Sequence, residues 1–143
     1  MVDTLELYSF AEKRDVGVYW FSLDRAESLS FMDEDGCCHI AMDPWSHRSI
    51  SEETVKLAHE LGHCMTGSFY NKYATCDNRK RHENRADKWA IEHTISAEEL
   101  HRAIQNGLVE IWSLAEHFGV TEEFMKKAVC YYTYGNLNVD LYF

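Results

Sequence analysis

Hydrophobic residues follow two different spacings in the two parts of this chain. Before Pro44 they fall in short runs rich in valine and aromatic side chains, bounded by polar and glycine-containing turns, which is typical of β-strands. From about residue 51 onward they recur every three or four positions, which is typical of amphipathic α-helices. The two patterns together predict an α+β fold in which a small sheet packs on helices.

The β-rich part is predicted to span residues 16–43. Its strands are expected at residues 16–23, 27–32 and 37–42. The last two predict a hairpin around residues 33–36, where Gly36 suits a positive φ. We therefore expect a small antiparallel sheet. Residues 3–13, ahead of it, fit either a short helix or an extended arm.

The helical part is predicted to contain two long helices and a C-terminal group. The long helices are expected at about residues 51–67 and 81–94, and the C-terminal helices within residues 96–133. Ser49 or Ser51 can cap the first helix, and Gly67 suits its C-terminal end. The polar stretch 71–78 is expected to link the two long helices. Ser96 begins a capping box that opens the next helix, and Thr121 can cap the last one.

A His-Glu-Leu-Gly-His motif at residues 59–63 is the most informative sequence in the chain. Residues four apart on a helix share a face, so His59 and His63 can bind one divalent metal while Glu60 reaches its open position. This is the minimal apparatus of a zinc metalloprotease. The alternative is an exposed helical face that carries two histidines and a carboxylate by chance.

A third metal ligand is available twenty residues after the motif. Glu83 and Asp87 are four residues apart in a helical stretch and so share a face. Glu83 can complete a His₂Glu site. Asp87 can accept the outer N–H of His59 or His63, which fixes the tautomer of the imidazole. Gly62 would let another backbone pass close beside these ligands.

These motifs resemble those of the ImmA/IrrE-type metallo-endopeptidases. The resemblance lies in Leu-Ala-His-Glu-Leu-Gly-His at residues 57–63 and in Glu-x-x-Ala-Asp-x-Trp-Ala at residues 83–90. More loosely, it covers residues 16–130. It implies a helical, zincin-like core that carries the sheet and the additional C-terminal helices.

The resemblance also implies an intracellular, zinc-dependent endopeptidase that cleaves a specific protein. By residue-to-residue match, His59, His63 and Glu83 would hold one Zn²⁺ ion, and Glu60 would be the catalytic base. Several relatives act on a repressor with a helix-turn-helix domain, so such a repressor is the expected protein partner. The alternative is a catalytically silent zinc-binding regulatory protein of a phage or mobile element.

Peptide hydrolysis at this site needs further groups from the chain. Glu60 would take a proton from water activated by the metal and pass it to the leaving amine. A donor must stabilise the oxyanion of the tetrahedral intermediate. The side chains near the motifs that can do so are Tyr70, Tyr73, His82 and His93. The edge of the strand at residues 37–42 is expected to pair with an extended substrate backbone.

The composition fits one domain spanning residues 1–143. A chain of 143 residues with 45% hydrophobic content can bury a sound core. No apolar run approaches the length of a transmembrane helix, and the N-terminal sequence lacks the regions of a signal peptide. The five cysteines, an odd number without framework spacing, suit a reducing compartment. We therefore expect a cytoplasmic protein with no membrane partner.

The cysteines are interpreted as structural residues. Cys37 and Cys38 are expected on a strand. We do not expect them to bind a metal ion, because adjacent thiols seldom chelate one. Cys64 follows a predicted ligand and faces away from it by about 100° on a helix. We therefore expect Cys64 to pack in the core, with redox modulation as the alternative. Cys76 and Cys130 are interpreted as fillers of core or surface.

The charge of the chain argues against nucleic-acid binding. Its formal net charge is −10, and such a surface repels phosphate backbones. Residues 114–121 look like the corner of a helix-turn-helix, but a DNA-reading helix would open with basic or amide residues. This one offers Glu122 and Glu123. We therefore expect a packing corner and no nucleic-acid partner.

Overall fold

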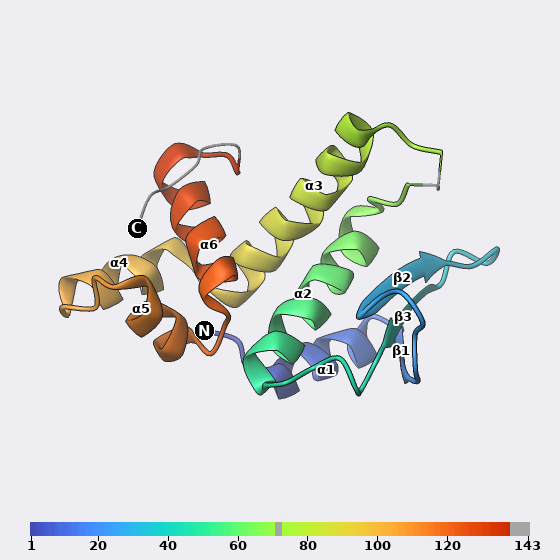
Figure 1. Ribbon diagram of the computed structural model, residues 1–143, viewed down its shortest axis with the longest axis horizontal. Coiled ribbons are helices and arrows are strands. Elements are labelled where there is room, and N and C mark those ends of the chain that lie inside the picture. Colours follow the sequence, from blue (N-terminus) through green and yellow to red (C-terminus); the bar gives the residue numbers. More distant parts are fainter. Residues whose placement is uncertain (71–72, 138–143) are drawn as a thin grey trace.

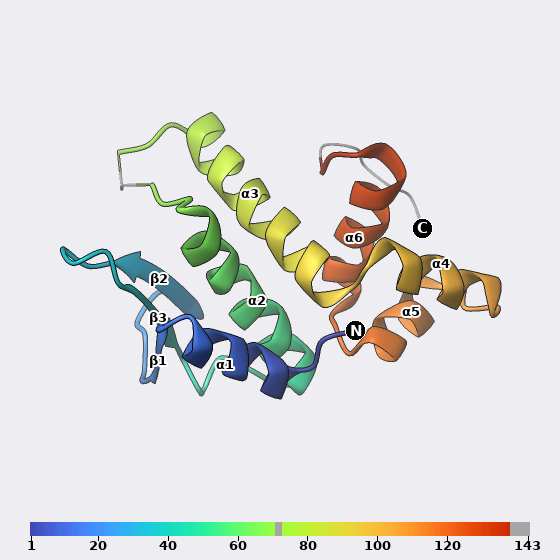
Figure 2. The same ribbon diagram turned by 180° about the vertical axis from the view of Figure 1, so that it is seen from behind.

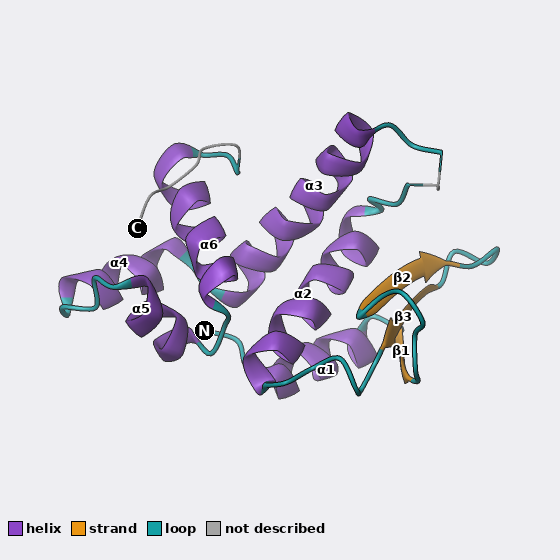
Figure 3. Ribbon diagram, in the orientation of Figure 1, coloured by secondary structure: helices purple, strands orange, loops and turns teal. Residues whose placement is uncertain are grey.

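The computed structural model describes residues 1–70 and 73–137 and confirms the α+β architecture. These residues form six helices and three strands (Figures 1 and 3). The helices are α1 Thr4–Lys13, α2 Ile50–Thr66, α3 Cys76–Thr94, α4 Ala97–Gln105, α5 Ile111–Phe118 and α6 Glu122–Tyr134. The strands are β1 Gly17–Trp20, β2 Ser28–Met32 and β3 Cys38–Met42. No helix in the described ranges is long and apolar enough to cross a membrane.

Helices α2 and α3 form the centre of the molecule and lie side by side (Figure 1). The sheet packs on one side of α2, whereas α4, α5 and α6 gather around the C-terminal end of α3. Helix α1 crosses α2 on the face seen in Figure 2. Large side chains from α1, β3, α2 and α3 fill the core between these elements, and the fully buried ones include Leu7, Ile40, Met42, Leu57, Leu61 and Ile91. This packing fixes the sheet and α3 against the helix that carries the His-Glu motif.

The three strands form a mixed sheet in the order β1-β3-β2. The predicted hairpin is confirmed, because β2 and β3 pair antiparallel with Ser28 opposite Met42 and Met32 opposite Cys38. Strand β1 instead joins the other side of β3 in parallel, so the sheet is not purely antiparallel. Central β3 therefore has a partner on both sides. The prediction that the edge of residues 37–42 receives a substrate is wrong, and within the described chain the edge strands are β1 and β2.

The ends of α2 follow the local signals in the sequence. Ser49 is the N-cap, with an extended backbone and a side-chain oxygen that accepts the backbone N–H of Glu52. Ser51, the other candidate, lies inside the helix. Gly67 ends the helix in the left-handed conformation, with φ of 66°.

Helix α3 begins earlier than predicted. It starts at Cys76, where Thr75 caps it by accepting the backbone N–H of Asn78. The expected linker at residues 71–78 is therefore too long by its last three residues, and Asn71 and Lys72 lie outside the described residues. The first turns of α3 are polar and exposed, so they lack the apolar spacing by which a helix is recognised.

Helices α4 and α6 begin at the predicted caps, whereas α5 begins after Glu110 without a side-chain cap. Ser96 accepts the backbone N–H of Glu99 at the start of α4, and Thr121 accepts that of Phe124 at the start of α6. Between α5 and α6, the side chains of Phe118 and Phe124 are buried. This burial supports the interpretation of the segment as a packing corner.

A disulfide joins Cys38, the first residue of β3, to Cys64 near the end of α2. The interpretation of Cys64 as a packing residue is therefore wrong, and the expectation of reduced cysteines fails for this pair. The inward face of β3 lies on α2, which places the two Cα atoms 5.8 Å apart. The bond ties the sheet covalently to α2, one residue beyond His63.

Candidate metal centre

Three metal-binding side chains meet between α2 and α3. His59 and His63 stand one turn apart on α2, and Glu83 faces them from α3. One possible ligand atom from each of the three lies within 4.8 Å of the other two. The ligands predicted from spacing are thus brought together. Among the described residues, no other group of three or more His, Cys, Asp or Glu side chains is placed to share an ion.

The distances between the donor atoms fit a small tetrahedral ion. The Nε2 atoms of His59 and His63 are 3.2 Å apart. The Glu83 carboxylate places Oε2 2.7 Å from His59 Nε2 and Oε1 3.2 Å from His63 Nε2. Donors about 2.0–2.1 Å from a tetrahedral ion are separated by about 3.3 Å. Two imidazoles and a carboxylate are also a donor set that suits zinc.

Hydrogen bonds to the outer nitrogens orient both imidazoles. Nδ1–H of His59 donates to Oδ1 of Asp87 at 2.7 Å, and Nδ1–H of His63 donates to the carbonyl oxygen of Ser68. Each ring therefore turns its Nε2 toward Glu83. This is the arrangement in which a carboxylate or carbonyl fixes the tautomer of a ligating histidine. The predicted contact of Asp87 is made to His59, whereas His63 uses the backbone.

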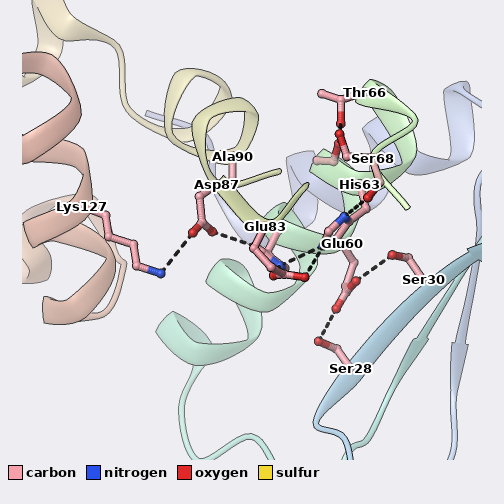
Figure 4. A network of polar contacts seen from close by, with 12 residues as sticks. Ser28, Ser30, Glu60, His63, Thr66, Ser68, Glu83, Asp87, Ala90 and Lys127 are labelled. Atoms are coloured by element: carbon pink, nitrogen blue, oxygen red, sulfur yellow. Dashed lines mark hydrogen bonds and ion pairs between the residues drawn. The ribbon is translucent and has the colours of Figure 1, made fainter. Parts of the chain in front are cut away.

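Lys127 of α6, which no motif in the sequence indicates, approaches the site from the C-terminal helices. Its Nζ donates to Oδ2 of Asp87 at 3.1 Å (Figure 4). The chain of contacts Lys127–Asp87–His59 thus links α6 to a metal ligand. Forty residues separate Lys127 from Asp87 in the sequence. No local spacing could reveal this contact, because it depends on how α6 packs against α3.

Glu60 lies beside the ligands and is almost fully buried, with 6% of its surface exposed. Its two carboxylate oxygens accept hydrogen bonds from Ser28 at 2.7 Å and Ser30 at 2.8 Å (Figure 4). Both serines belong to β2, and no motif in the sequence indicates their contact with Glu60. An alternating strand places residues 28 and 30 on one face, but the sequence does not say which helix that face meets.

The electrostatics of the metal-free site show how strongly the ligands are paired. Burial of His59 opposes its protonation, but hydrogen bonds to Asp87 and Glu83 outweigh it and raise the pKa of His59 to about 10. Burial likewise opposes ionisation of Glu83, yet hydrogen bonds from His59 and His63 hold the pKa of Glu83 well below its ordinary value. A bound cation would take the place of the proton on His59.

An open cleft of about 670 Å³ passes over these side chains. Strand β2 lines one side with residues 28–30, α2 forms the floor, and α3 and α6 line the other side. Volumes of this size are typical of small-ligand sites. The side of β2 that faces away from β3 is unpaired within the described chain, so its backbone is available beside the cleft.

The four candidate oxyanion donors separate in space. The Tyr70 hydroxyl lies in the cleft and donates to Glu83 Oε1 at 2.9 Å. Tyr73 is 81% exposed and lines a different hollow. The His82 ring stacks on Tyr70, 6.0 Å between centroids, rather than lining the cleft. His93 stacks on Trp89 at the far end of α3. Of the four, the structure brings only Tyr70 to the ligands.

Comparisons with known proteins identify the family of this chain. No curated protein sequence matches the chain. A solved structure described as a Mycobacterium tuberculosis transcriptional regulator shares the fold, with a TM-score of 0.59 and 16% identity. That similarity covers 85% of this chain but 39% of the regulator, so the chain spans well under half of its length. The model of a peptidase family, the IrrE N-terminal-like domain, matches residues 46–129, more than half of the chain and all of the metal-binding cluster. The chain belongs to the family of the IrrE N-terminal-like domain.

Proposed function

We propose that this protein is a zinc-dependent endopeptidase. The observation that carries the proposal is the position of Glu60, a buried carboxylate beside three metal ligands and at the floor of an open cleft. A structural zinc site closes its fourth position with another ligand and needs no base. The described cluster instead has three ligands, His59, His63 and Glu83, and a fourth side open to the cleft.

The residues of the cleft have separable roles in this mechanism. A zinc ion, when bound, supplies Lewis acidity, which polarises a peptide carbonyl and makes water more acidic. Glu60 accepts the proton of the attacking water and then donates it to the leaving amine. Tyr70 is the side chain placed to donate a hydrogen bond to the developing oxyanion, after its phenol turns from Glu83. Asp87 keeps the imidazole of His59 oriented throughout.

The free edge of β2 provides a binding surface for an extended peptide. Residues 28–30 of this strand line the cleft, and the backbone groups on the outer side of β2 have no strand partner within the described chain. A peptide that adds to this edge gains main-chain hydrogen bonds that do not depend on its sequence. Such pairing would carry the scissile bond across the cleft and over Glu60.

The substrate we propose is a partner regulatory protein, such as a repressor with a helix-turn-helix domain. The structural similarity to a transcriptional regulator is consistent with a role in regulation. A folded repressor must expose an extended segment to reach the β2 edge. The cleft has β2 on one side and α6 on the other, and it is open to solvent between them. An extended segment could therefore enter it.

The variant Glu60→Gln tests the proposed reaction. It keeps the size of the side chain and removes the base, so zinc content should be unchanged while hydrolysis falls by at least about 100-fold. The probe is a quenched fluorogenic peptide library, incubated with zinc-loaded wild type and variant. Equal turnover by both proteins would show that Glu60 is not the base.

A second candidate function is a zinc-binding regulator that cleaves nothing. The observation that favours it is the similarity to a transcriptional regulator. In that case the zinc-loaded wild type should cleave no member of the peptide library, nor a candidate repressor, and Glu60→Gln should leave partner binding unchanged. Zinc-dependent cleavage that is lost in Glu60→Gln excludes this candidate.

A further inference from the structure

In strand β2, serine side chains occupy inward positions where a strand packed on a helix normally carries apolar side chains. Its first two inward positions hold Ser28 and Ser30, and the third, at the end of the strand, holds the exposed Met32. Its outward positions hold the exposed Leu29 and Phe31. On the neighbouring strand β3, the residues in the same rows as the two serines are the fully buried Met42 and Ile40. A face that packs on the core is normally apolar. The two serines therefore require an explanation other than core packing.

The two hydroxyls share one partner. Ser28 Oγ donates to Glu60 Oε2 at 2.7 Å, and Ser30 Oγ donates to Glu60 Oε1 at 2.8 Å. Successive inward positions of a strand are spaced so that each serine meets a different oxygen of the same carboxylate. The pair thus fixes both the position and the plane of a group whose last torsion is otherwise broad.

We propose that Ser28 and Ser30 are positioning residues that hold Glu60 as the general base. This proposal rests on the proposed function and assigns a role to two residues outside the ligand motifs. An ionised carboxylate can accept about four hydrogen bonds. The two serines use one acceptor site on each oxygen, so Glu60 retains capacity for the proton of an attacking water. The serines orient the base without blocking it.

The surrounding structure keeps this strand in register with Glu60. Strand β2 pairs along its whole length with β3, and β3 is tied to α2 by the disulfide between Cys38 and Cys64. The serines and Glu60 therefore belong to one rigid unit. Because β2 also borders the cleft, a peptide on its outer edge and the base on its inner face share the same strand.

Acetohydroxamate is a probe that reports the position of Glu60 without any peptide substrate. It chelates a metal ion through two oxygens, and its acidic proton needs an acceptor beside the ion. Its affinity for the zinc-loaded protein is measured by calorimetry for wild type, S28A/S30A, Glu60→Gln and the triple variant. Zinc content is measured for each protein, and the exposed Ser9→Ala serves as the matched control.

We expect S28A/S30A to retain zinc and to bind acetohydroxamate about tenfold more weakly, the scale of a hydrogen bond to a charged group. The same serine substitutions should change affinity by less than about twofold when Glu60 is already Gln, because the serines act through the carboxylate. The variant S28T/S30T, which keeps both hydroxyls on β-branched side chains, should bind within about threefold of wild type. If S28A/S30A does not fold, the single variants give the same comparison at about threefold each.

Three results would overturn the proposal. One is wild-type affinity in S28A/S30A, and another is an equal loss in the wild-type and Glu60→Gln backgrounds, as a general packing defect would give. The third is a zinc-loaded wild type that binds acetohydroxamate no more tightly than Glu60→Gln does, since Glu60 would then not accept a proton on the open side of the ion. Failure of the proposed peptidase function can be distinguished from these results. In that case the peptide library is not cleaved, but the acetohydroxamate affinities of the variants still show whether the serines act through Glu60. Where a peptide is cleaved, kcat should fall in S28A/S30A and KM should stay within about twofold.

Discussion

Gly62 of α2 lies against the backbone of α3, so that a Cβ atom at this position would lie 2.3 Å from the carbonyl oxygen of Ala86. The contact confirms that a small residue between the two histidines lets a second backbone pass beside the ligands. It also sets how closely Glu83 and Asp87 approach α2 from α3.

Replacing Gly62 with Ala should destabilise the protein. In a helix interior, Gly→Ala ordinarily adds about 1 kcal/mol of stability. Here the neighbouring atom is backbone and cannot give way, so we expect a net loss of about 1–3 kcal/mol, together with weaker zinc binding. Chemical denaturation and zinc titration measure the two effects. Gly17→Ala, on β1, is the comparison variant, because the three atoms nearest its added Cβ all belong to the Tyr19 side chain, which can move, rather than to backbone. A more stable Gly62→Ala protein would contradict this account.

Lys127→Met should weaken zinc binding by less than about tenfold, whereas Asp87→Ala should weaken it by about 10–100-fold. Asp87 contacts His59 directly, while Lys127 acts only through Asp87 and is partly exposed. Competition with a chromophoric chelator measures both affinities. Lys126→Met, an exposed neighbour on the same helix, serves as the control and should bind zinc as the wild type does. Equal affinities for the two lysine variants would show that α6 does not influence the site.

The disulfide between Cys38 and Cys64 should raise the free energy of unfolding. For a separation of 26 residues, the constraint on the unfolded chain amounts to about 3–4 kcal/mol. We therefore expect a reducing agent to lower the melting temperature of the wild type, but not that of Cys38→Ala. Cys37→Ala, at the adjacent exposed cysteine, should still respond to reduction. Alkylation of the unreduced, unfolded protein followed by mass spectrometry should modify three of the five cysteines, and modification of all five would contradict the pairing.

The metal-free protein should lose stability as pH rises toward 10. His59 has a folded pKa raised from 6.5 to about 10, so its charged form is favoured by folding. The stability gained is fully present below 6.5 and is lost as pH rises through about 10. Melting temperatures of metal-free wild type and His59→Gln, compared from neutral pH upward, isolate this contribution. The difference between the two proteins should shrink with rising pH, and a constant difference would contradict the pairing of His59 with Asp87 and Glu83.

The parts of this structure that were predicted correctly depend on local chemistry. Ser49, Ser96 and Thr121 cap helices because each side chain reaches a backbone N–H three residues further on. His59 and His63 meet because residues four apart share a helical face. Both relationships can be derived from the sequence without knowing how the helices pack.

The parts that were missed depend on tertiary contacts. Ser28 and Ser30 meet Glu60 only because β2 lies on α2, and Lys127 meets Asp87 only because α6 folds back on α3. The strand order also depends on tertiary contacts. The alternation of side chains along β1 does not indicate that this strand pairs with β3 on the side opposite β2. Five cysteines without framework spacing gave no basis for choosing one pair.

The most direct test of the metal centre is the zinc content of the purified protein, measured by elemental analysis for wild type and Glu83→Ala. Glu83 contributes the ligand from α3, so its substitution removes one ligand and leaves the motif on α2 intact. The account predicts close to one zinc ion per wild-type chain and a sharp fall in the variant. A wild type that holds no zinc, even after incubation with it, would contradict the metal centre and the proposed peptidase function.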